Sequence, residues 1–574
     1  MKTRIRALLE TLYDPTVVDG LERRIEARLS EVRRRPGRSE LWSESDVLLI
    51  SYADSIRGHE QSPISSLRGF LQRWMSGLIT HVHLLPFFPF TSDDGFAVSD
   101  YLTVAEDNGT WADITALSKD VELVFDLVIN HASSAHLHFQ EFLEDREPGR
   151  SYFFTASAEQ DVSAVTRPRA TPLLQAHETP NGVRHVWSTF SRDQVDWDFS
   201  NPDVLYMFLD IFITYIERGA SWMRLDAIAY LWKEVGTSCV HLPQTHAVVQ
   251  LLRAVAESIS SDIKILTETN VPLAENLSYF GAGDEAHIVY NFSLPPLLVH
   301  ALLTGEGDYL TRWCQSLPEL ASGCTYLNFT ASHDGIGLRP AEGILGDGDR
   351  HRLVDCVRQF GGRLTERRKP DGSLSPYEAN ISLFDALKGT VAGQDDLQVE
   401  RFLVSQGVML SLQGVPALYY NSLLAAPNNL GGLKKTGRNR TINRKKWTLM
   451  EIEERLQPGE AAPWRVLQGL KAMMEVRRNQ PCFHPEAPQE ALSLHPRIFA
   501  LRRDSVCLEQ TVLCLFNISA EDVEIDLPSL GLGPLGSWSE IYGQRVDHQR
   551  DGLLIIRSYG LVWLEALGDQ HSDG

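Results

Sequence analysis

Four apolar stretches of the chain end in side chains that can do acid–base or nucleophilic chemistry. They are residues 123–131 (LVFDLVINH), 221–229 (SWMRLDAIA), 263–270 (IKILTETN) and 326–334 (YLNFTASHD). In the second stretch Arg224 and Asp226 are two residues apart, so in a β-strand their side chains share one face. Burying such a pair is costly unless its partners satisfy it, and the pair alone fits a structural ion pair as well as a functional site. Because all four stretches end in His, Asp or Glu, they predict one site built from several strand ends.

Two carboxylates in this set are suited to the cleavage of a glycosidic bond. Asp226 and Glu268 follow neighbouring predicted strands and can face one another across a pocket. In glycoside cleavage one carboxylate attacks the anomeric carbon and the other protonates the leaving oxygen. A separation near ~5 Å indicates a covalent intermediate with retention, and one of ~6.5–9.5 Å indicates inversion.

A third carboxylate, Asp334, belongs to the same set. It needs His131, His333 and Arg224 nearby to hold hydrogen-bonded geometry and to keep the protonation states of the carboxyls apart. A divalent metal site is the competing interpretation, because His and Asp also ligate such ions. The chain has no HxH, HExxH or CxxC spacing to support a metal, and Arg224 would repel a cation. We therefore expect no metal.

Composition limits the classes of partner. The chain has 574 residues, and 54 Lys and Arg against 75 Asp and Glu give a net charge of −21, which argues against nucleic acid or an anionic membrane as a partner. An anionic substrate would need a local basic patch. The seven Cys include no CxxC pair, so neither a zinc site nor a disulfide framework is indicated. Charges near the N-terminus do not fit a signal peptide, and no apolar run reaches about 18 residues. These features predict a cytoplasmic protein without transmembrane helices; they leave the oligomeric state open.

The elements that must position these side chains alternate between strand and helix from Val47 onward. Amphipathic helical stretches such as 65–78, 204–218 and 245–258 separate most of the apolar runs. The predicted strands are 47–53, 81–87, 121–129, 221–229, 263–269, 286–292, 325–332 and 408–420. This α/β alternation favours a (β/α)8 TIM barrel, whose site forms at the carboxyl ends of the strands. A doubly wound sheet is the alternative, but no Gly-rich phosphate loop follows the first strand.

The remaining segments suggest additions to the barrel. Residues 1–45 have helical apolar spacing and are expected to pack on the main domain. The barrel is expected over 46–131 and 201–489, with an inserted subdomain B at 132–200, after the third strand, and a second long excursion from Asp334 to about residue 388. Short β runs in 490–574 predict a C-terminal β-sandwich.

Several short motifs resemble those of the α-amylase-type glycoside hydrolases. The segments DLVINH (126–131), MRLDA (223–227) and SHD (332–334), together with Glu268, resemble four short regions typical of that family. Its sucrose phosphorylase branch is indicated by HLLPFFPF (83–90), SDDGF (92–96), GTSC (236–239), HDGIG (333–337) and TINRK (441–445). The resemblance covers the chain from about residue 46 to the end. Within the branch, the N-terminal helical segment, AVTRPRA (164–170) and TETNVP (267–272) look most similar to glucosylglycerate phosphorylases.

The resemblance implies roles for the residues that match. Asp226 would be the nucleophile that forms a β-glucosyl-enzyme, Glu268 the general acid and then base, and Asp334 the stabiliser of the transition state. The residues implied to bind the glucosyl unit are Asp93 and Arg444 at its far edge, Phe96 and Phe190 as walls, and Gln194, His131, His333 and Arg224.

The acceptor side is also implied by the resemblance. Arg167 and Arg169, on either side of Pro168, are candidates to bind inorganic phosphate as co-substrate or the carboxylate of glycerate; a solvated surface loop is the alternative. Tyr377 matches a phosphate-binding Tyr of sucrose phosphorylases. Those enzymes have His two residues after the general acid, where this chain has Asn270, and Glu378 follows Tyr377 here. Both differences argue against sucrose as the substrate.

Three hypotheses follow from the sequence. The first is a retaining phosphorylase that converts 2-O-α-glucosylglycerate to α-glucose 1-phosphate and glycerate without a further cofactor; glucosylglycerol, sucrose and sucrose 6-phosphate are related substrates. The second is a hydrolase or transglucosidase on the same scaffold. The third is a non-catalytic sugar-binding or regulatory protein, which the complete set of Asp226, Glu268 and Asp334 disfavours.

Overall fold

A computed structural model describes residues 2–34, 40–169, 171–368, 373–548 and 553–567. Within these ranges, parallel strands close into a barrel in the order β1-β18-β12-β11-β10-β9-β4-β3. The barrel strands are β1 (Leu48–Ser51), β3 (His81–Leu84), β4 (Glu122–Leu127), β9 (Ala220–Leu225), β10 (Lys264–Thr267), β11 (Ile288–Tyr290), β12 (Thr325–Phe329) and β18 (Val415–Tyr419). Each predicted strand overlaps one of them, so the (β/α)8 barrel is confirmed.

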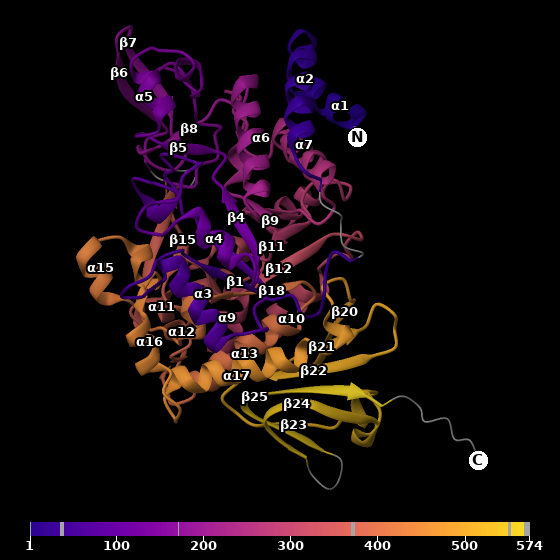
Figure 1. Cartoon of the computed structure of the whole chain (residues 1–574). Coiled ribbons are helices and arrows are strands. Elements are labelled where there is room, and N and C mark those ends of the chain that lie inside the picture. The colour runs from indigo at the N-terminus through magenta and orange to yellow at the C-terminus, as the bar shows by residue number, and fades with distance from the viewer. Residues whose placement is uncertain (1, 35–39, 170, 369–372, 549–552, 568–574) are drawn as a thin grey trace.

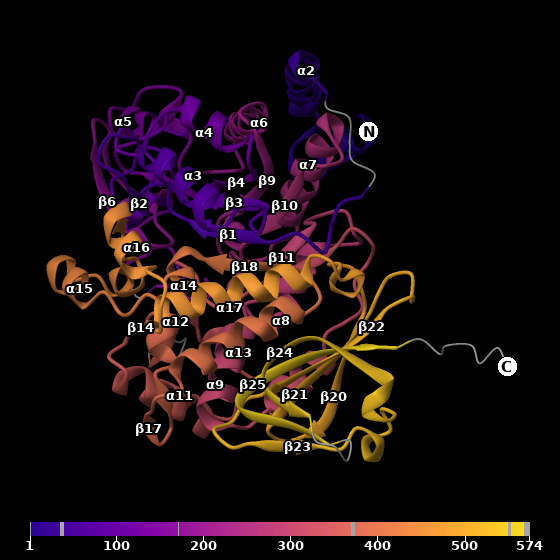
Figure 2. The ribbon, with the colours of Figure 1, turned by 60° about the horizontal axis from the view of Figure 1, so that its bottom comes forward.

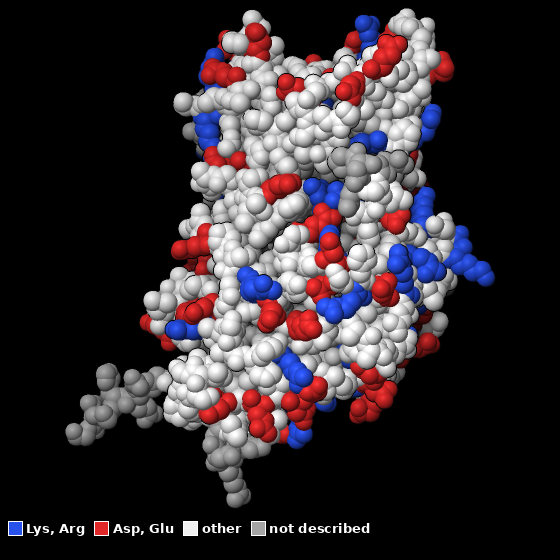
Figure 3. Space-filling model, turned by 180° about the vertical axis from the view of Figure 1, so that it is seen from behind, with Lys and Arg blue, Asp and Glu red and all other residues white. Residues whose placement is uncertain are grey.

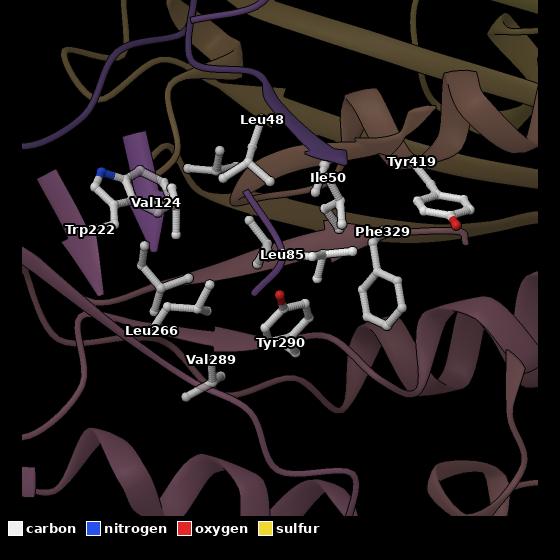
Figure 4. Packing of buried hydrophobic residues seen from close by; sticks show 14 of the residues in the cluster. Leu48, Ile50, Leu85, Val124, Trp222, Leu266, Val289, Tyr290, Phe329 and Tyr419 are labelled. Atoms are coloured by element: carbon white, nitrogen blue, oxygen red, sulfur yellow. The ribbon is translucent and has the colours of Figure 1, made fainter. Parts of the chain in front are cut away.

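The barrel strands are nearly continuous apolar runs because both of their faces are buried. Leu48, Val124, Trp222, Leu266 and Phe329 come from five different strands and belong to one buried cluster (Figure 4). In the ladder between β4 and β9, Asp126 is paired with Arg224. The register therefore places two charged residues side by side at the carboxyl end of an otherwise apolar sheet.

One predicted strand begins too early. Residues 408–420 were expected to form a single strand, but Val408–Ser411 end helix α13 (Gln398–Ser411), and β18 starts only at Val415. Between them the chain turns at Gly414, whose φ of +127° is a conformation that glycine adopts easily. A short apolar run has no periodicity that separates a buried helix from a buried strand.

Helices surround the barrel (Figure 1). The predicted helices 65–78, 204–218 and 245–258 correspond to α3, α6 and α7. Asn201 caps the start of α6 with its side chain, and Pro202 begins the helix, a common N-terminal arrangement. The helices between and beyond the strands are α3 (Pro63–Trp74), α4 (Trp111–Leu117), α6 (Pro202–Glu217), α7 (Pro243–Ile259), α8 (Leu273–Leu277), α9 (Leu294–Thr304), α10 (Asp308–Gln315), α14 (Tyr420–Leu423), α15 (Leu430–Thr436), α16 (Leu449–Arg455) and α17 (Ala462–Arg477).

The N-terminal segment forms two helices, α1 (Lys2–Leu12) and α2 (Pro15–Glu31), that pack on the outside of the barrel (Figure 1). Asp14 caps α2 and Pro15 is its first residue, which explains the break between the two. Arg4 of α1 contacts Glu257 of α7 at 3.0 Å, and Arg28 of α2 contacts Asp210 of α6 at 2.6 Å. The expected packing of this segment on the main domain is confirmed.

Two excursions leave the barrel on the side of the strand carboxyl ends. The first follows β4 and contains β5 (His131–Ser133), α5 (Leu137–Leu143), β6 (Leu174–Thr179), β7 (Gly182–Trp187) and β8 (Gln194–Asp196); β5 pairs with β8 and β6 with β7. The second follows β12 and contains β13 (Ile336–Gly337), α11 (Asp347–Gln359), β14 (Arg363–Arg368), β15 (Leu374–Asn380), α12 (Leu383–Ala386), β16 (Gly389–Thr390) and β17 (Gly393–Gln394). Its strands β13, β15 and β14 form a small sheet. A further short pair joins β2 (Ile56–Arg57) to β19 (Trp447–Thr448).

The C-terminal strands confirm the expected β region, but in the described residues hydrogen bonds join them into one six-stranded sheet rather than two separate ones. They are β20 (Gln489–His495), β21 (Ile498–Asp504), β22 (Thr511–Asn517), β23 (Val523–Ile525), β24 (Trp538–His548) and β25 (Leu554–Ala566). The long β25 pairs with β23 near its start and with β22 near its end, which makes the sheet continuous. Leu561 and Trp563 face the barrel core, whereas Val562 and Leu564 belong to a second apolar cluster. The sheet lies against α13 (Figure 2).

Neither sign of charge dominates the face of the molecule that lies opposite to the view of Figure 1. Acidic and basic side chains are interspersed there (Figure 3). Within the described ranges, none of the helices has both the length and the apolar composition needed to cross a bilayer.

Candidate active site

The site lies at the carboxyl ends of the barrel strands. Asp226 directly follows β9, and Glu268 directly follows β10. Their backbone amides continue the ladder: Asp226 donates to the carbonyl of Leu127 and Glu268 to that of Leu225, both at 3.1 Å. These hydrogen bonds fix the two residues relative to the strands, as a preorganised catalytic pair requires.

One pocket brings together most of the residues predicted from the sequence. Its lining contains Asp93, Phe96, His131, Arg169, Phe190, Gln194, Asp226, Glu268, Asn270, His333, Asp334 and Tyr377. Arg224, Arg444 and Arg167 are not part of this lining. Arg224 and Arg444 instead contact carboxylates of the pocket from behind, as described below.

Arg224 is buried beneath Asp226. Its Nη1 donates to Asp226 Oδ1 at 2.9 Å and also to Asp126, which accepts a second hydrogen bond from Nε2 of His83 at 2.7 Å. The buried cation is thus shared by two carboxylates, which compensates the cost of removing all three charges from water. The chain His83–Asp126–Arg224–Asp226 orients the Asp226 carboxylate. Sequence reasoning did not predict His83 as a member of this group.

The protonation of Asp226 and Glu268 follows from burial and from Arg224. Burial raises the pKa of both carboxyls above their usual values, and the charge of Asp334 raises both further. The charge of Arg224 opposes this at both carboxyls, and Arg224 also donates a hydrogen bond directly to Asp226 at 2.9 Å. Glu268 accepts a hydrogen bond from the backbone amide of Ala227 at 3.1 Å, which lowers its pKa as well. The direct ion pair with Arg224 favours the ionised form of Asp226.

Asp334 has the opposite electrostatics. Burial alone would raise its pKa, but Arg440, His333 and Arg444 together hold the pKa of Asp334 well below its usual range. Arg440 Nη1 lies 2.8 Å from Asp334 Oδ1, and Arg444 Nη2 lies 3.5 Å from the same oxygen. Asp334 is therefore ionised at neutral pH, and its negative charge can stabilise positive charge that develops nearby.

Arg444, from the segment after α15, contacts carboxylates of the pocket from behind. Its Nε donates to the carbonyl of His333 at 2.8 Å, and its Nη1 contacts Asp94 at 2.7 Å and Asp93 at 3.4 Å. The Asp93 loop itself needs a glycine, because at Gly95 (φ +118°) a Cβ would lie 2.6 Å from the carbonyl oxygen of Pro86. Arg444 and Asp93, both expected at the far edge of the glucosyl unit, thus lie together, and Asp94 is the nearer partner of Arg444.

Two aromatic side chains border the pocket. Phe96 stacks on the ring of His333 with 5.1 Å between centroids and 5° between planes, and Phe190 packs against His131, also at 5.1 Å. His131 Nε2 lies 2.9 Å from the carbonyl oxygen of Phe96, and Gln194 donates to the same oxygen at 3.3 Å. The histidine and glutamine are thus held in position by the backbone of the aromatic wall.

The predicted acceptor residues are only partly brought together. Arg169 lies over the ring of Tyr377 with 5.5 Å to the centroid, and its Nη1 is 3.9 Å from Glu378. Asn270 and Tyr377 line the same pocket. Arg167 does not line it, so of the two arginines beside Pro168, Arg169 is the one that the fold places at the site.

Comparison with known proteins places this site in a family. The alpha-amylase catalytic domain family matches residues 67–315. A glucosylglycerate phosphorylase of Spirochaeta thermophila is 42% identical to the chain, over 92% of this chain and 91% of that protein. A sucrose phosphorylase of Bifidobacterium adolescentis is 30% identical, over 77% of this chain and 86% of that protein. The chain belongs to the α-amylase family, in its sucrose phosphorylase branch. This confirms the resemblance predicted from the motifs.

A solved structure of this branch of the α-amylase family agrees in fold. The crystal structure of a sucrose 6F-phosphate phosphorylase from Thermoanaerobacter thermosaccharolyticum has a TM-score of 0.72 and 24% identity, covering 83% of this chain and 94% of that chain. At this identity the similarity shows the fold alone.

Seven residues of the pocket lining were not predicted as site residues. They are Ala227, Ala229, Tyr230, Thr269, Val271, Glu378 and Arg440. Glu378 was noted only as a difference from sucrose phosphorylases, and Arg440 stands four residues before Arg444 in a segment without strand or helix periodicity. The repeated arginines in 438–444 were the available signal, but a basic loop is more often solvated than buried.

Proposed function

We propose that the chain is a retaining phosphorylase that reversibly converts 2-O-α-glucosylglycerate and inorganic phosphate to α-glucose 1-phosphate and glycerate. The observation that carries the proposal is the 42% identity with a glucosylglycerate phosphorylase over nearly the full length of both chains. Asn270 and Glu378, which differ from the sucrose phosphorylase pattern, line the pocket beside Glu268 and support an acceptor other than fructose.

In the first half-reaction the glucosyl unit moves to the enzyme. The Asp226 carboxylate attacks the anomeric carbon while the bond from that carbon to the glycerate oxygen breaks. Glu268 gives its proton to the departing oxygen, so that glycerate leaves as an alcohol. Asp334, held ionised by the arginines around it, stabilises the positive charge that develops on the sugar ring.

In the second half-reaction phosphate replaces glycerate. An oxygen of the phosphate dianion attacks the anomeric carbon from the face that glycerate left, and the ester bond to Asp226 breaks. The dianion needs no base, so Glu268 regains its proton from solvent; phosphate that arrives as the monoanion gives its proton to Glu268. Two inversions at one carbon give net retention, and the product is α-glucose 1-phosphate. Each residue returns to its starting protonation state.

The other predicted residues divide between the two sides of the reacting carbon. We assign the glucosyl unit to Asp93, Phe96, His131, Phe190, Gln194, Arg224, His333 and Arg444. On the acceptor side, Arg169, Asn270 and Tyr377 line the pocket, and Arg167 lies in the same loop as Arg169. Cations near the open side favour phosphate over water as the attacking group.

The acceptor is tested in the reverse direction. We expect release of inorganic phosphate from α-glucose 1-phosphate to be fastest with D-glycerate, compared in separate reactions with glycerol, fructose and fructose 6-phosphate. A preference for another of these acceptors would keep the mechanism and change the substrate. No phosphate release with any acceptor, together with formation of free glucose, would favour the hydrolase.

The pH dependence should reflect the two raised carboxyl pKa values. Glucosyl transfer to the enzyme needs Asp226 ionised and Glu268 protonated, so kcat/KM for glucosylglycerate falls with acid as Asp226 gains its proton. It also falls with alkali as Glu268 loses its proton. Because burial raises both pKa values, the acidic and alkaline limbs of the pH profile should both lie above the pH range in which ordinary carboxyl groups titrate. In a ping-pong reaction this parameter does not depend on phosphate, so the titration of phosphate does not enter. An alkaline limb that persists in Glu268→Gln would show that another group is the acid.

A further inference from the structure

Arg440 lies at the boundary between the reacting pocket and its entrance. An outer pocket adjoins the one that contains Asp226 and is lined in part by residues 437–441. The side chains that line both are Asp93, Arg169, Phe190, Gln194 and Arg440. A molecule that enters from the outer pocket must pass these residues to reach Glu268.

The guanidinium of Arg440 is held from one side by Glu378. Nε and Nη2 donate to the two oxygens of Glu378 at 3.2 and 2.6 Å, a side-on arrangement that fixes the plane of the group. Glu378 is buried, with 2% of its surface exposed. The third nitrogen, Nη1, faces the pocket at 2.8 Å from Asp334 and 3.6 Å from Asp93.

The other arginines near the reacting carbon are committed elsewhere. Arg224 is buried between Asp126 and Asp226, and Arg444 contacts Asp94 and the carbonyl of His333. Arg169 lies on the acceptor side, but its contact with Glu378 is long, at 3.9 Å. Among the described residues, Arg440 is therefore the cation that combines a rigid support with a face toward the pocket.

We propose that Arg440 binds the anionic group of the acceptor, and that Glu378 positions it. The proposal rests on the proposed function. Phosphate attacks the same face of the anomeric carbon that glycerate leaves, so the phosphate group and the glycerate carboxylate occupy the same region in turn. One guanidinium can serve both, because its planar donors match the oxygens of either anion. In a pocket that already contains Asp93, Asp226, Glu268 and Asp334, an anion requires such a compensating charge.

The test compares two reactions of the same glucosyl-enzyme intermediate, transfer to phosphate and hydrolysis. With α-glucosyl fluoride as donor, the enzyme yields glucose 1-phosphate with phosphate or glucose with water, and the ratio does not depend on how much of the enzyme is folded. We expect Arg440→Ala to raise the phosphate concentration that gives equal amounts of the two products by roughly 10- to 100-fold, the range for losing a charge-assisted hydrogen bond. Lys434→Ala is the matched control: this lysine is exposed, stands six residues earlier and lines neither the inner nor the outer pocket, so the ratio should stay the same.

Charge selectivity separates ligand binding from a structural role. Because Arg440 also contacts Asp334, each transfer is measured relative to hydrolysis in the same reaction. By this ratio, transfer from α-glucosyl fluoride to D-glycerate should be weakened in Arg440→Ala as strongly as transfer to phosphate, whereas transfer to glycerol, which has no charge, should change little. Glu378→Gln keeps the size of the side chain but loosens the support. The negative charge of Glu378 is already neutralised by Arg440, so its removal should affect phosphate binding less than the loss of support for Arg440 does. Glu378→Gln should therefore raise the KM for phosphate by a smaller factor than Arg440→Ala, with little change in kcat.

Several outcomes would overturn the proposal. An unchanged ratio in Arg440→Ala would do so, as would equal losses with glycerol and glycerate, or a lower KM for phosphate in Glu378→Gln. If Arg440→Ala consumed no donor, calorimetric titration of the intact variant with phosphate and with D-glycerate would decide, and wild-type affinity would contradict it. If the wild-type enzyme itself formed no glucose 1-phosphate, the proposed function would fail instead.

Discussion

Replacement of Glu268 by Gln should lower kcat/KM for glucosylglycerate by about 10²- to 10⁴-fold, the usual contribution of a general acid. The glycerate oxygen is a poor leaving group unless it receives a proton, and glutamine has none to give. The side chain keeps its size and can still accept from the amide of Ala227, so the pocket should keep its shape. The measurement is the initial rate of glucose 1-phosphate formation at saturating phosphate.

The donor α-glucosyl fluoride separates loss of the acid from loss of the pocket. Fluoride leaves without a proton, and phosphate is already an anion when it attacks. Glu268→Gln should therefore retain most of its activity with this donor and phosphate. Equal losses with both donors would assign Glu268 a structural or binding role, and near wild-type phosphorolysis of glucosylglycerate would remove it from catalysis.

Replacement of Asp226 by Ala should abolish turnover of both donors, with a loss of about 10⁴-fold or more, as for other covalent nucleophiles. Without the carboxylate no glucosyl-enzyme forms, whatever the leaving group. The small side chain also leaves a space beside Arg224, in which an added anion such as azide can take the place of the nucleophile. With α-glucosyl fluoride and azide, we expect the variant to form β-glucosyl azide, whose configuration nuclear magnetic resonance identifies.

The matched control for Asp226→Ala is Asp120→Ala. Asp120 is an exposed carboxylate just before the amino end of β4, where it pairs with Arg68 at 2.6 Å, and its loss should leave turnover unchanged. Wild-type turnover by Asp226→Ala would support the non-catalytic sugar-binding protein or another nucleophile. Formation of α-glucosyl azide would indicate that a second group still forms a covalent intermediate.

The two carboxylates that we propose as nucleophile and general acid could be located from the sequence because they directly follow barrel strands. A buried parallel strand is a short apolar run, and a charged residue at its end is conspicuous against that background. Asp226 and Glu268 are such residues, and the geometry of a barrel brings all strand ends to one rim. For these residues, the position at a strand end in the local sequence was enough to predict the location at the rim of the barrel.

Other features depended on packing that no local pattern contains. Residues 408–420 are mostly apolar throughout, and no pattern within them separates helix from strand. In the structure, however, the first residues of this run end α13, and Val415 begins β18. The C-terminal strands were recognisable one by one, but the length of β25 joined them into a continuous sheet. In both cases contacts with distant elements determine the structure, because these contacts outweigh the weak local preferences of the residues.

The sequence by itself determined the barrel and the three carboxylates, and it predicted most of the pocket residues that we assign to the glucosyl unit. The tertiary structure alone decided which side chains surround them on the acceptor side. Arg440 comes from the segment before β19, Glu378 from β15 and Arg169 from the first excursion, and they meet because two long excursions fold over the same rim. His83 and Asp126 likewise support Arg224 through the register of neighbouring strands. Contacts of this kind depend on the free energy of the whole fold. The sequence around a loop residue does not indicate which distant residue it will contact.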